Sequence, residues 1–483
     1  MRLEKTTFRR NLANINPAFC HSGKKTARYS MLRRKVTKVL EAWAGSSRTK
    51  ALLVTGARQI GKSYSIRELG KTKFGTYIEL NLYENKRARS ALLAAKTASE
   101  FVSRVSILSG TPIVERDTLV FIDEIQEAPD LMTMVKFLVD DGRCAWAFSG
   151  SMLGTEFKGI RSYPVGSVHE VTMRPLDWEE FCWAVGTSDD ALRAVSDCCE
   201  REEAVPTYIH DALLSNFRTY LVVGGMPEAV LRLIESRGDL ASVRMVQADL
   251  NKQYKRDISK YAGPRTLQVQ SIFDQLPVQL EGDSQRFVIN SIDPSARFEK
   301  YQRDFVWLQN AGVALKTELV DEPKSPLRKT ANAGKFKLYQ SDTGMLMERY
   351  PREIAQAAYL DDKDPNLGGI YENAVAQELT AQGHELFYYQ TKKRGEVDFV
   401  VDGPKGKAVA VEVKSGRYYH AHAALDRLLT TPEYGVDLGI VLSRGNVERA
   451  GKVLYLPLYA MFVLPLYLCG GHDDGFRVEI ANI

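Results

Sequence analysis

Cysteine is scarce in this chain of 483 residues. The six cysteines stand at positions 20, 144, 182, 198, 199 and 469. Zinc sites need Cys or His in closely spaced pairs, and disulfide frameworks need a much higher density of cysteine. Because neither pattern is present, the sequence argues against both classes and favours a reducing cytoplasm.

Long hydrophobic runs are also missing. The longest uncharged run, Val453 to Cys469, is short for a membrane span and is interrupted by Pro457 and Pro465. We predict a buried strand with its flanking turn there, and no membrane partner. Residues 1–30 contain no continuous apolar segment, which argues against a secretory signal.

The part of the chain that can fold lacks an excess of one charge sign. The formal net charge is +5, but residues 1–30 hold seven Lys and Arg against Glu4 alone, so the remainder carries −1. This near-neutral balance gives no support for a polyanionic partner. We interpret residues 1–30 as a basic disordered tail or an over-long start, since Met31 begins the first periodic segment. An organelle presequence is the alternative.

A phosphate-binding pattern is present near the start of the chain. The apolar run Ala51 to Val54 precedes a G-x-x-x-x-G-K-S string, formed by Gly56, Ala57, Arg58, Gln59, Ile60, Gly61, Lys62 and Ser63. In this pattern, backbone N–H groups wrap phosphates at a helix N-terminus. Lys62 would reach the β and γ phosphates, and the Ser63 hydroxyl would hold Mg²⁺. The spacing therefore predicts a strand, loop and helix that bind a nucleoside triphosphate.

Two acids follow a second apolar run, Leu119 to Ile122. A buried parallel strand of this kind delivers Asp123 and Glu124 at its C-terminal edge, where ligands bind in such sheets. Asp123 would hold Mg²⁺ through water, and Glu124 would orient or deprotonate the attacking water. This pair favours ATP hydrolysis over kinase chemistry; a solvated strand end is the alternative.

A third run, Cys144 to Phe148, ends in Ser149-Gly150-Ser151. Ser151 lies where a polar side chain would sense the γ-phosphate or position water. A plain turn between strand and loop is the alternative.

These strings together resemble a family of prokaryotic AAA-type ATPases that carry a C-terminal domain of unknown function with a restriction-endonuclease-like core. The resemblance rests on the loop, on Asp123-Glu124-Ile125-Gln126 and on further strings, which include Arg174 to Phe181, Val223 to Ala229 and Lys337 to Gly344. It implies an α/β fold in which a P-loop core with a parallel sheet is followed by a helical lid, a winged-helix-like module and a restriction-endonuclease-like domain. The corresponding ranges are 31–187, 188–265, 266–345 and 346–483. The helical spacing from Ser188 to about Tyr261 agrees with the lid.

The C-terminal region has a second constellation. A predicted strand that contains Asp398 and another that contains Glu412 and Lys414 are joined by a turn near Lys405. Reflection about that turn brings the three charged residues together, in the D…E-x-K arrangement of restriction-endonuclease-like nucleases. Asp398 and Glu412 would hold Mg²⁺, and Lys414 would position or activate water.

Four other residues and several alternatives accompany this constellation. Glu372 matches a helix glutamate found in part of that superfamily, and the basic string from Lys392 to Arg394 would meet a phosphodiester backbone or form an ordinary solvated hairpin. The alternatives for the charged cluster are a structural Glu412–Lys414 ion pair, a retained fold without catalysis, or binding of metal or nucleic acid without cleavage.

The sequence thus predicts a Mg²⁺-dependent ATPase whose nucleotide state controls a nuclease-like domain that binds or cleaves nucleic acid. The alternative is a nucleotide-sensing switch or scaffold that binds protein partners. A homo-oligomer is compatible with either function. Arg256 would then reach a phosphate in its own or a neighbouring subunit, unless it is a surface arginine beside Asp257.

Overall fold

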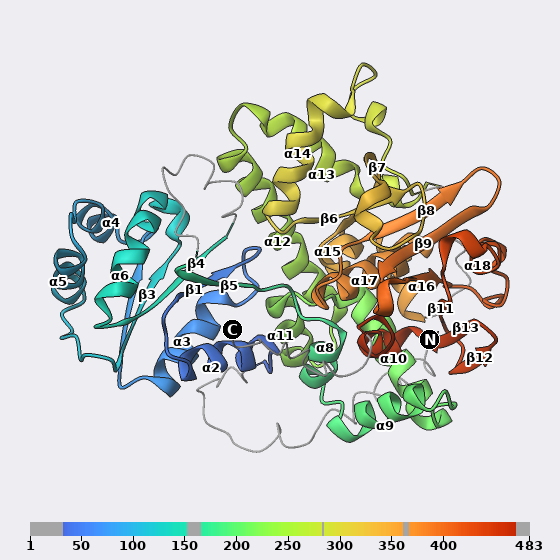
Figure 1. Cartoon of the computed structure of the whole chain (residues 1–483), viewed down its shortest axis with the longest axis horizontal. Helices are drawn as coiled ribbons and strands as arrows, with labels where there is room; N and C mark the ends of the chain where they lie inside the picture. The colour runs from blue at the N-terminus through green and yellow to red at the C-terminus, as the bar shows by residue number, and fades with distance from the viewer. Residues whose placement is uncertain (1–31, 152–165, 283–284, 361–366, 470–483) are drawn as a thin grey trace, which may run out of the picture.

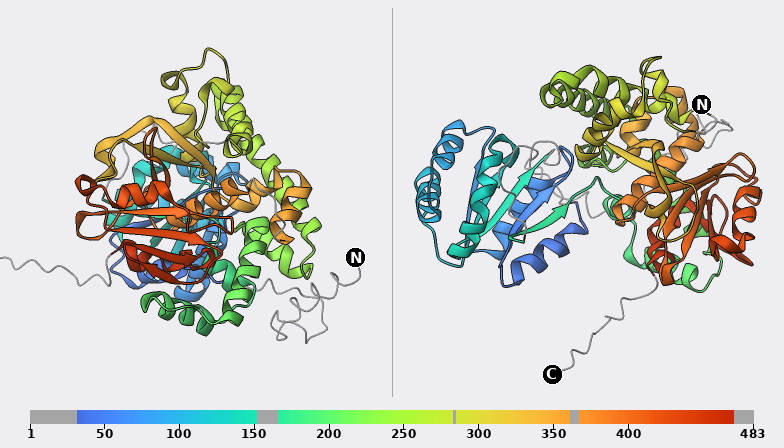
Figure 2. Two further views of the ribbon diagram at one scale, coloured as in Figure 1. Left: turned by 90° about the vertical axis from the view of Figure 1, so that its right-hand side faces the viewer. Right: turned by 45° about the horizontal axis from the view of Figure 1, so that its top comes forward.

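The computed structural model describes residues 32–151, 166–282, 285–360 and 367–469. The predicted tail of residues 1–30, with Cys20, lies outside these ranges. The described chain forms two β-sheets, one in each half of the sequence, with a group of helices between them (Figure 1). The right-hand view of Figure 2 shows the same separation of the N-terminal body from the C-terminal body.

The first sheet has five strands in the order β2-β3-β4-β1-β5, and every neighbouring pair is parallel. The strands are β1 (Ala51–Thr55), β2 (Thr76–Asn81), β3 (Thr118–Asp123), β4 (Ala145–Gly150) and β5 (Val168–Thr172). The helices of this body are α2 (Val36–Gly45), α3 (Lys62–Lys73), α4 (Lys86–Leu93), α5 (Ala98–Ser109) and α6 (Val135–Asp141). The predicted α/β core with a parallel sheet is confirmed.

Alternate residues of these strands belong to two different hydrophobic clusters, as the period of two along a strand requires. Leu52 and Phe121 pack with residues of α2 and α3, whereas Leu53 and Val120 pack with residues of α5 and α6. Both faces of the sheet are therefore covered by helices. This arrangement explains why the central strands β1, β3 and β4 are nearly unbroken apolar runs.

Helices follow the first sheet. They are α8 (Trp178–Ala184), α9 (Asp189–Glu200), α10 (Thr207–Val223), α11 (Pro227–Glu235) and α12 (Leu240–Tyr261). The helical structure predicted between residues 188 and 261 is confirmed. The longest of them, α12, runs between the two bodies and reaches the loop that follows β1 (Figure 1).

The second sheet is mixed and has the order β12-β13-β11-β10-β9-β8-β6-β7. Its strands are β6 (Ala314–Val320), β7 (Ala331–Gln340), β8 (Phe387–Thr391), β9 (Gly395–Asp402), β10 (Ala408–Val413), β11 (Leu438–Ser443), β12 (Glu448–Ala450) and β13 (Val453–Pro457). The accompanying helices are α13 (Thr266–Leu280), α14 (Phe298–Asn310), α15 (Thr343–Glu348), α16 (Arg352–Leu360), α17 (Gly368–Ala381), α18 (Ala423–Leu429) and α19 (Pro465–Leu468).

This sheet corrects the expected boundary between residues 345 and 346. Strand β6 pairs in parallel with β8, through Glu318 opposite Phe387, so β6 and β7 belong to the same sheet as the C-terminal strands. The segment 266–345 is therefore not a separate winged-helix module. Pairing with β6 covers the edge of β8, which would otherwise expose a row of unpaired backbone groups.

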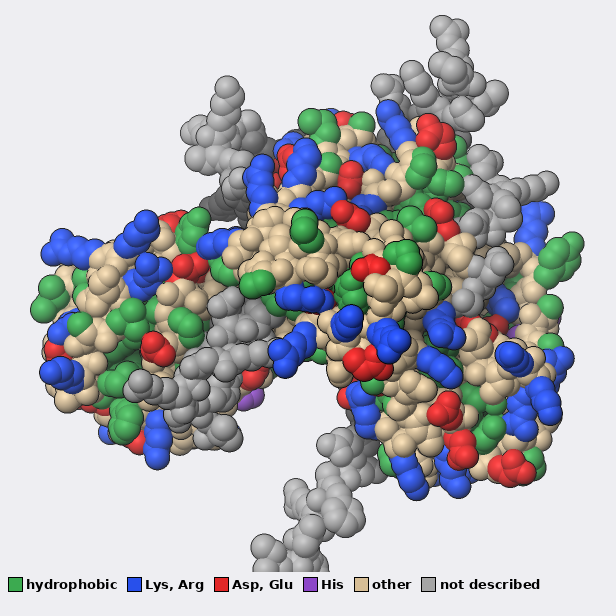
Figure 3. Space-filling view, turned by 90° about the horizontal axis from the view of Figure 1, so that it is seen from above, with side chains coloured by type: hydrophobic (Ala, Val, Ile, Leu, Met, Phe, Trp, Pro, Cys, Tyr) green, Lys and Arg blue, Asp and Glu red, His purple; other side chains and the backbone are tan. Residues whose placement is uncertain are grey.

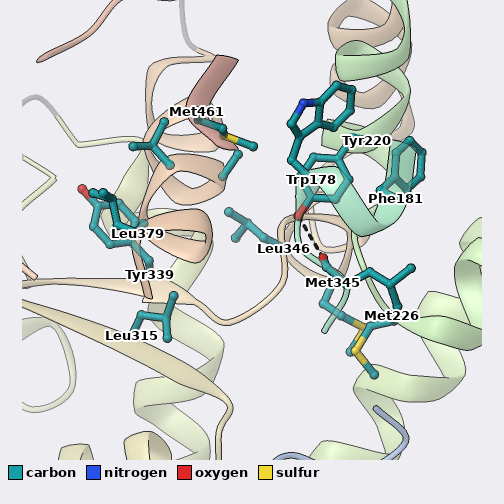
Figure 4. Close-up of a cluster of buried hydrophobic side chains, with 14 of the residues drawn as sticks. Trp178, Phe181, Tyr220, Met226, Leu315, Tyr339, Met345, Leu346, Leu379 and Met461 are labelled. Atoms are coloured by element: carbon teal, nitrogen blue, oxygen red, sulfur yellow. Dashed lines mark hydrogen bonds between the residues drawn. The ribbon is translucent and has the colours of Figure 1, made fainter. Parts of the chain in front are cut away.

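One hydrophobic cluster joins the helices to the C-terminal sheet. Figure 4 shows Trp178, Phe181 and Tyr220 from α8 and α10 on one side of this cluster, and Leu346, Leu379 and Met461 on the other. Residues Val453 to Leu468 form β13 and short helical turns within it. Over the described ranges, no helix has the length and apolar character needed to cross a membrane.

Glu378 of α17 lies in this junction and is fully buried. Its Oε2 accepts a hydrogen bond from the Trp178 backbone N–H at 3.0 Å, and its Oε1 accepts one from Gln382 at 3.0 Å. Burial raises the pKa of Glu378 to about 8; the charge of Asp177 adds to the rise and Lys35 opposes it. The carboxyl is therefore protonated in the folded protein at neutral pH.

We expect the Glu378→Gln substitution to remove part of the pH dependence of stability. The folded pKa lies above the ordinary value, so the stabilising contribution is complete below pH 4.5 and is lost as the pH rises to about 8. Between these values the free energy of unfolding of the wild type should fall by roughly 1.4 kcal/mol per pH unit. The variant should not show this fall. Urea unfolding of both proteins from pH 5 to 8.5 measures the difference. Parallel profiles would contradict it, and the exposed Glu235→Gln is the matched control.

Candidate functional site

The loop between β1 and α3 contains the first six residues of the phosphate-binding string, and the last two, Lys62 and Ser63, begin α3. Gly56 has φ +130°, and a Cβ built there would come within 2.2 Å of the Met173 carbonyl oxygen. Gly61, with φ +93°, precedes the first turn of α3. Both backbone conformations favour glycine. The loop therefore leads directly into a helix N-terminus, where N–H groups face an anion.

Lys62 lies across this loop. Its ammonium donates to the carbonyl oxygens of Gly56 at 3.0 Å and Ala57 at 2.6 Å. Burial lowers the pKa of Lys62 to about 8, although the charges of Glu124 and Asp123 oppose the shift. The side chain is thus a buried cation held by neutral oxygens, ready to be paired with a phosphate.

Asp123 receives polar side chains from neighbouring elements. Its Oδ2 accepts hydrogen bonds from the Ser63 hydroxyl at 2.9 Å and the Asn81 amide at 3.3 Å, and its Oδ1 accepts one from the Ser149 hydroxyl. Adjacent hydroxyl and carboxylate oxygens are the ligands that Mg²⁺ prefers, so Ser63 and Asp123 fit this ion. Asn81 was not among the predicted site residues, although a polar residue at the end of β2 is a weak signal.

Glu124 follows Asp123 in the left-handed backbone region, with φ 56°. For a residue with a side chain this conformation is uncommon and is often found at functional sites. Its carboxylate accepts a hydrogen bond from the Gln126 amide, and the same amide donates to the Ser151 hydroxyl at 3.5 Å. Gln126 therefore connects the two predicted residues, a role that sequence spacing alone did not reveal.

Helix α12 contacts the tip of the loop. Arg58 pairs with Asp257 at 3.1 Å and donates to the Tyr261 hydroxyl at 3.2 Å, while the Gln59 amide donates to Gln253 at 2.6 Å. Residues 253, 257 and 261 are four apart and share one face of the helix.

Arg256 lies on a different, exposed face of α12. That it reaches a phosphate of its own or a neighbouring subunit stays a prediction. The helical spacing turns Asp257, rather than Arg256, toward the loop.

Asp398 and Glu412 lie at the second predicted site, on the antiparallel strands β9 and β10. The last paired positions are Phe399 and Val411, so the next residue of each strand faces the other. Asp398 Oδ2 accepts a hydrogen bond from the Val413 N–H at 2.7 Å. Glu412 Oε1 pairs with the ammonium of Lys414 at 2.7 Å.

Lys337 of β7 completes this cluster and was not predicted. Its side chain has no exposed surface, and its ammonium lies 3.0 Å from Glu372 Oε2, 2.5 Å from Glu396 Oε1 and 3.9 Å from Asp398 Oδ1. The Tyr339 hydroxyl donates to Glu372 at 2.7 Å. Lys337 begins one of the strings that carry the family resemblance, but that string gave it no role in the site, because its partners are far away in the chain and are brought near only by the second sheet.

The cluster concentrates negative charge. Burial, followed by the charges of Glu372 and Glu412, raises the pKa of Asp398 well above its ordinary value. Burial also raises the pKa of Glu396 and of Glu412, while Lys337 and Lys414 respectively oppose the shifts. Burial alone would lower the pKa of Lys337, but the surrounding acids raise it overall. Four carboxylates share two ammonium groups, so two negative charges are in excess when all are ionised.

A divalent cation would neutralise this excess. Glu412 is 4% exposed, and its Oε2 is buried without a hydrogen-bond partner. An unpaired buried carboxylate oxygen is costly and fits a cation ligand. However, no three His, Cys, Asp or Glu side chains in the described ranges converge as a ready metal site. Lys337 occupies the space between Glu372 and Glu396, which leaves Asp398 and Glu412 as the residues that would hold Mg²⁺.

Family models match three parts of the chain. An AAA domain matches residues 48–182, a domain of unknown function (DUF8612) matches residues 214–351, and another (DUF4143) matches residues 367–461. The first match contains the whole loop, both acids after β3 and Ser151. With the parallel sheet, it shows that the N-terminal body is an AAA-type P-loop ATPase domain. The other two descriptions name no activity.

Solved structures give weaker likenesses. A Walker-type ATPase of Pyrococcus abyssi is 12% identical, with a TM-score of 0.44 over 68% of this chain and 99% of that chain. Cdc6p of Pyrobaculum aerophilum is 10% identical, with a TM-score of 0.25 over 72% and 99%. At these scores neither likeness bears on function. No curated protein matches the chain at a significant level.

Proposed function

We propose that the first site binds ATP with Mg²⁺ and hydrolyses the γ-phosphate. The observation that carries this proposal is the meeting of Lys62, Ser63, Asp123 and Glu124 at the C-terminal ends of β1 and β3. Ser63 and Asp123 would hold the Mg²⁺, which neutralises phosphate charge when bound. The N–H groups of residues 57–63 orient the phosphates, and Lys62 replaces its two carbonyl partners by phosphate oxygens.

Glu124 is the proposed base for the attacking water. Its carboxylate lies one residue beyond Asp123, and Gln126 fixes its orientation by a hydrogen bond. Ser151, which accepts a hydrogen bond from the same amide, would contact the terminal phosphate. A carboxylate that is held in place orients water and accepts its proton as the bond to phosphorus forms.

We further propose that the nucleotide state is transmitted through α12 and the turn after α14. Helix α12 holds Arg58 and Gln59 at the tip of the loop. Gly312 approaches the other end of the loop, because a Cβ built there would lie 3.0 Å from the Ala57 nitrogen. A rearrangement of the loop would therefore change its contacts with α12 and with the turn after α14. Residues 188–265 would act as the lid of the core 31–187 in this scheme.

For the C-terminal body we propose a restriction-endonuclease-like domain that binds or cleaves nucleic acid. The supporting observation is the buried cluster of Asp398, Glu412 and Lys414, with its excess negative charge and the unpaired oxygen of Glu412. Asp398 and Glu412 would hold Mg²⁺, and Lys414 would position water. The basic hairpin 392–394 would face the phosphodiester backbone of the nucleic acid. On the face shown in Figure 3, acidic and basic side chains are interspersed.

A switch or scaffold function is the second candidate, favoured by the Lys337 ammonium, which neutralises part of the same cluster without a metal. In either case we propose a cytoplasmic location, which the low density and the spacing of the six cysteines support. A homo-oligomer would give the exposed Arg256 a neighbouring nucleotide to contact.

Nuclease assays separate the two candidates. Full-length protein is incubated with Mg²⁺ or Mn²⁺, ATP, and labelled single-stranded, duplex and branched DNA or RNA, alongside Asp398→Ala and Glu412→Ala. We expect binding or cleavage by the wild type, with cleavage lost in both variants. The exposed Glu353→Ala serves as the matched control. If the protein neither binds nor cleaves any of these substrates, the nuclease-like proposal is rejected and the switch or scaffold function remains.

A further inference from the structure

A cavity of about 380 Å³ lies between the AAA domain and the C-terminal body. The start of the phosphate-binding loop and the end of β5 line one side of it, and α14, the end of β7 and α17 line the other. Its polar side chains include Thr55, Thr172, Arg174, Gln309, Gln377 and Thr380. Because both bodies contribute to the lining, any molecule bound there would contact both of them.

Arg174 is the notable residue of this cavity. Among the residues that the structure describes, none forms a hydrogen bond or an ion pair with its guanidinium group. Burial lowers the pKa of Arg174, and no carboxylate opposes the shift. By contrast, the nearby buried Arg34 pairs with Glu180 at 3.0 Å. Arg174 is partly buried, and its guanidinium lines the cavity without a counter-ion among the described residues, so it is available to an anion bound there.

The acidic residue of the cavity lining, Glu170, does not serve as the counter-ion of Arg174. Glu170 also lines the cavity, but it is exposed and lies beyond 4 Å of the Arg174 nitrogens, since no ion pair joins the two. Glu170 has a separate interaction of its own. The charge of Arg174 therefore stays uncompensated inside the described part of the cavity.

The backbone of Arg174 is tied to the phosphate-binding loop. Arg34 donates one hydrogen bond to the carbonyl oxygen of Arg174 at 2.7 Å and another to that of Ile60 at 2.9 Å. The cavity itself includes Gly56 and Ala57 from the start of the loop. An anion bound to Arg174 would thus affect both the phosphate-binding loop and the C-terminal body.

We propose that Arg174 binds a phosphate group in this cavity. Guanidinium binds phosphate through two parallel N–H donors, and the hydroxyl and amide groups of the lining can complete its hydrogen bonds. Two sources share this chemistry: the terminal phosphate of a nucleotide in the adjacent loop, and a separate small phosphate such as the released product. The first source rests on the proposed ATP site, whereas the second does not.

The test is a set of calorimetric titrations of full-length wild type, Arg174→Met, Arg174→Lys and Lys62→Ala. The probes are ATP, ADP and inorganic phosphate, with Mg²⁺ present. Methionine retains the apolar stem of Arg174 without its charge, and lysine retains the charge without the paired donors. The exposed Arg193→Met is the matched control, and thermal melting shows whether each variant is folded.

Each source predicts a distinct result. If the nucleotide supplies the phosphate, Arg174→Met weakens ATP binding by about 10-fold or more and leaves ADP within about twofold, with Arg174→Lys in between. If the phosphate is separate, wild type and Lys62→Ala bind inorganic phosphate and Arg174→Met does not. The proposal would be overturned if Arg174→Met bound all three probes with wild-type affinity. It would also be overturned if this variant lost affinity equally for ATP and ADP and bound inorganic phosphate as the wild type does.

The same titrations keep this proposal distinct from the ATP site. Wild type that binds ATP, with loss in Lys62→Ala but wild-type behaviour in Arg174→Met, would reject only the role of Arg174. Equal ATP binding by wild type and Lys62→Ala would instead reject the proposed loop function, and the phosphate titration would then decide the cavity alone.

Discussion

Replacement of Glu124 by glutamine is expected to leave ATP bound while its hydrolysis slows on the order of 10²- to 10⁴-fold, the usual contribution of a general base. Glutamine has nearly the same shape and can still meet the Gln126 side chain, but it cannot accept the proton of the attacking water. The Mg²⁺ and phosphate ligands, Ser63 and Lys62, are unchanged in this variant. Glu124→Gln should therefore keep its affinity for ATP while its rate of hydrolysis falls.

Phosphate release under saturating ATP, together with calorimetric titration of the nucleotide, measures both quantities. The exposed Glu84→Gln, in the turn that follows β2, controls for loss of a carboxylate near the same sheet edge. Wild-type turnover by Glu124→Gln would exclude the role of Glu124 as a base. Loss of ATP binding in this variant would indicate that Glu124 acts on binding rather than on the chemical step.

The Lys62→Ala substitution is expected to weaken ATP binding by roughly 10- to 150-fold, since a charge-assisted hydrogen bond is worth about 1.5–3 kcal/mol. The wild-type ammonium is buried beside the loop, and phosphate oxygens would replace the carbonyl oxygens of Gly56 and Ala57 as its acceptors. Titration of both proteins with ATP and Mg²⁺ measures the loss. The surface variant Lys71→Ala should bind as the wild type does.

The pH profile of the same titration tests the charge of Lys62. Burial holds the pKa of Lys62 in the free protein at about 8, below its ordinary value, while a bound phosphate would stabilise the charged form. Wild-type affinity should therefore fall as the pH rises above about 8, by up to roughly tenfold per pH unit, while the profile of Lys62→Ala shows no such fall. Coincident pH profiles of the two proteins would remove Lys62 from the phosphate contact.

The sequence by itself determined the first site because its parts are local. Residues 56–63 are contiguous, and their spacing imposes the loop and the start of α3. Asp123 and Glu124 follow an apolar run whose burial on two faces requires a central parallel strand, and parallel strands end at one edge. The pairing of Asp398 with Glu412 was also accessible, since a short turn sets the register of two adjacent strands.

Only the tertiary structure decided which distant residues reach these sites. Lys337 meets Glu372 and Glu396 because β6 and β7 join the C-terminal sheet, a pairing with β8 that no local pattern encodes. Asp257 meets Arg58 across 199 positions because α12 packs over the loop. Such contacts depend on how whole elements bury their apolar faces, a property of the assembled core rather than of residue spacing. The cavity lined by Arg174 has the same origin, since it forms only where the two bodies meet.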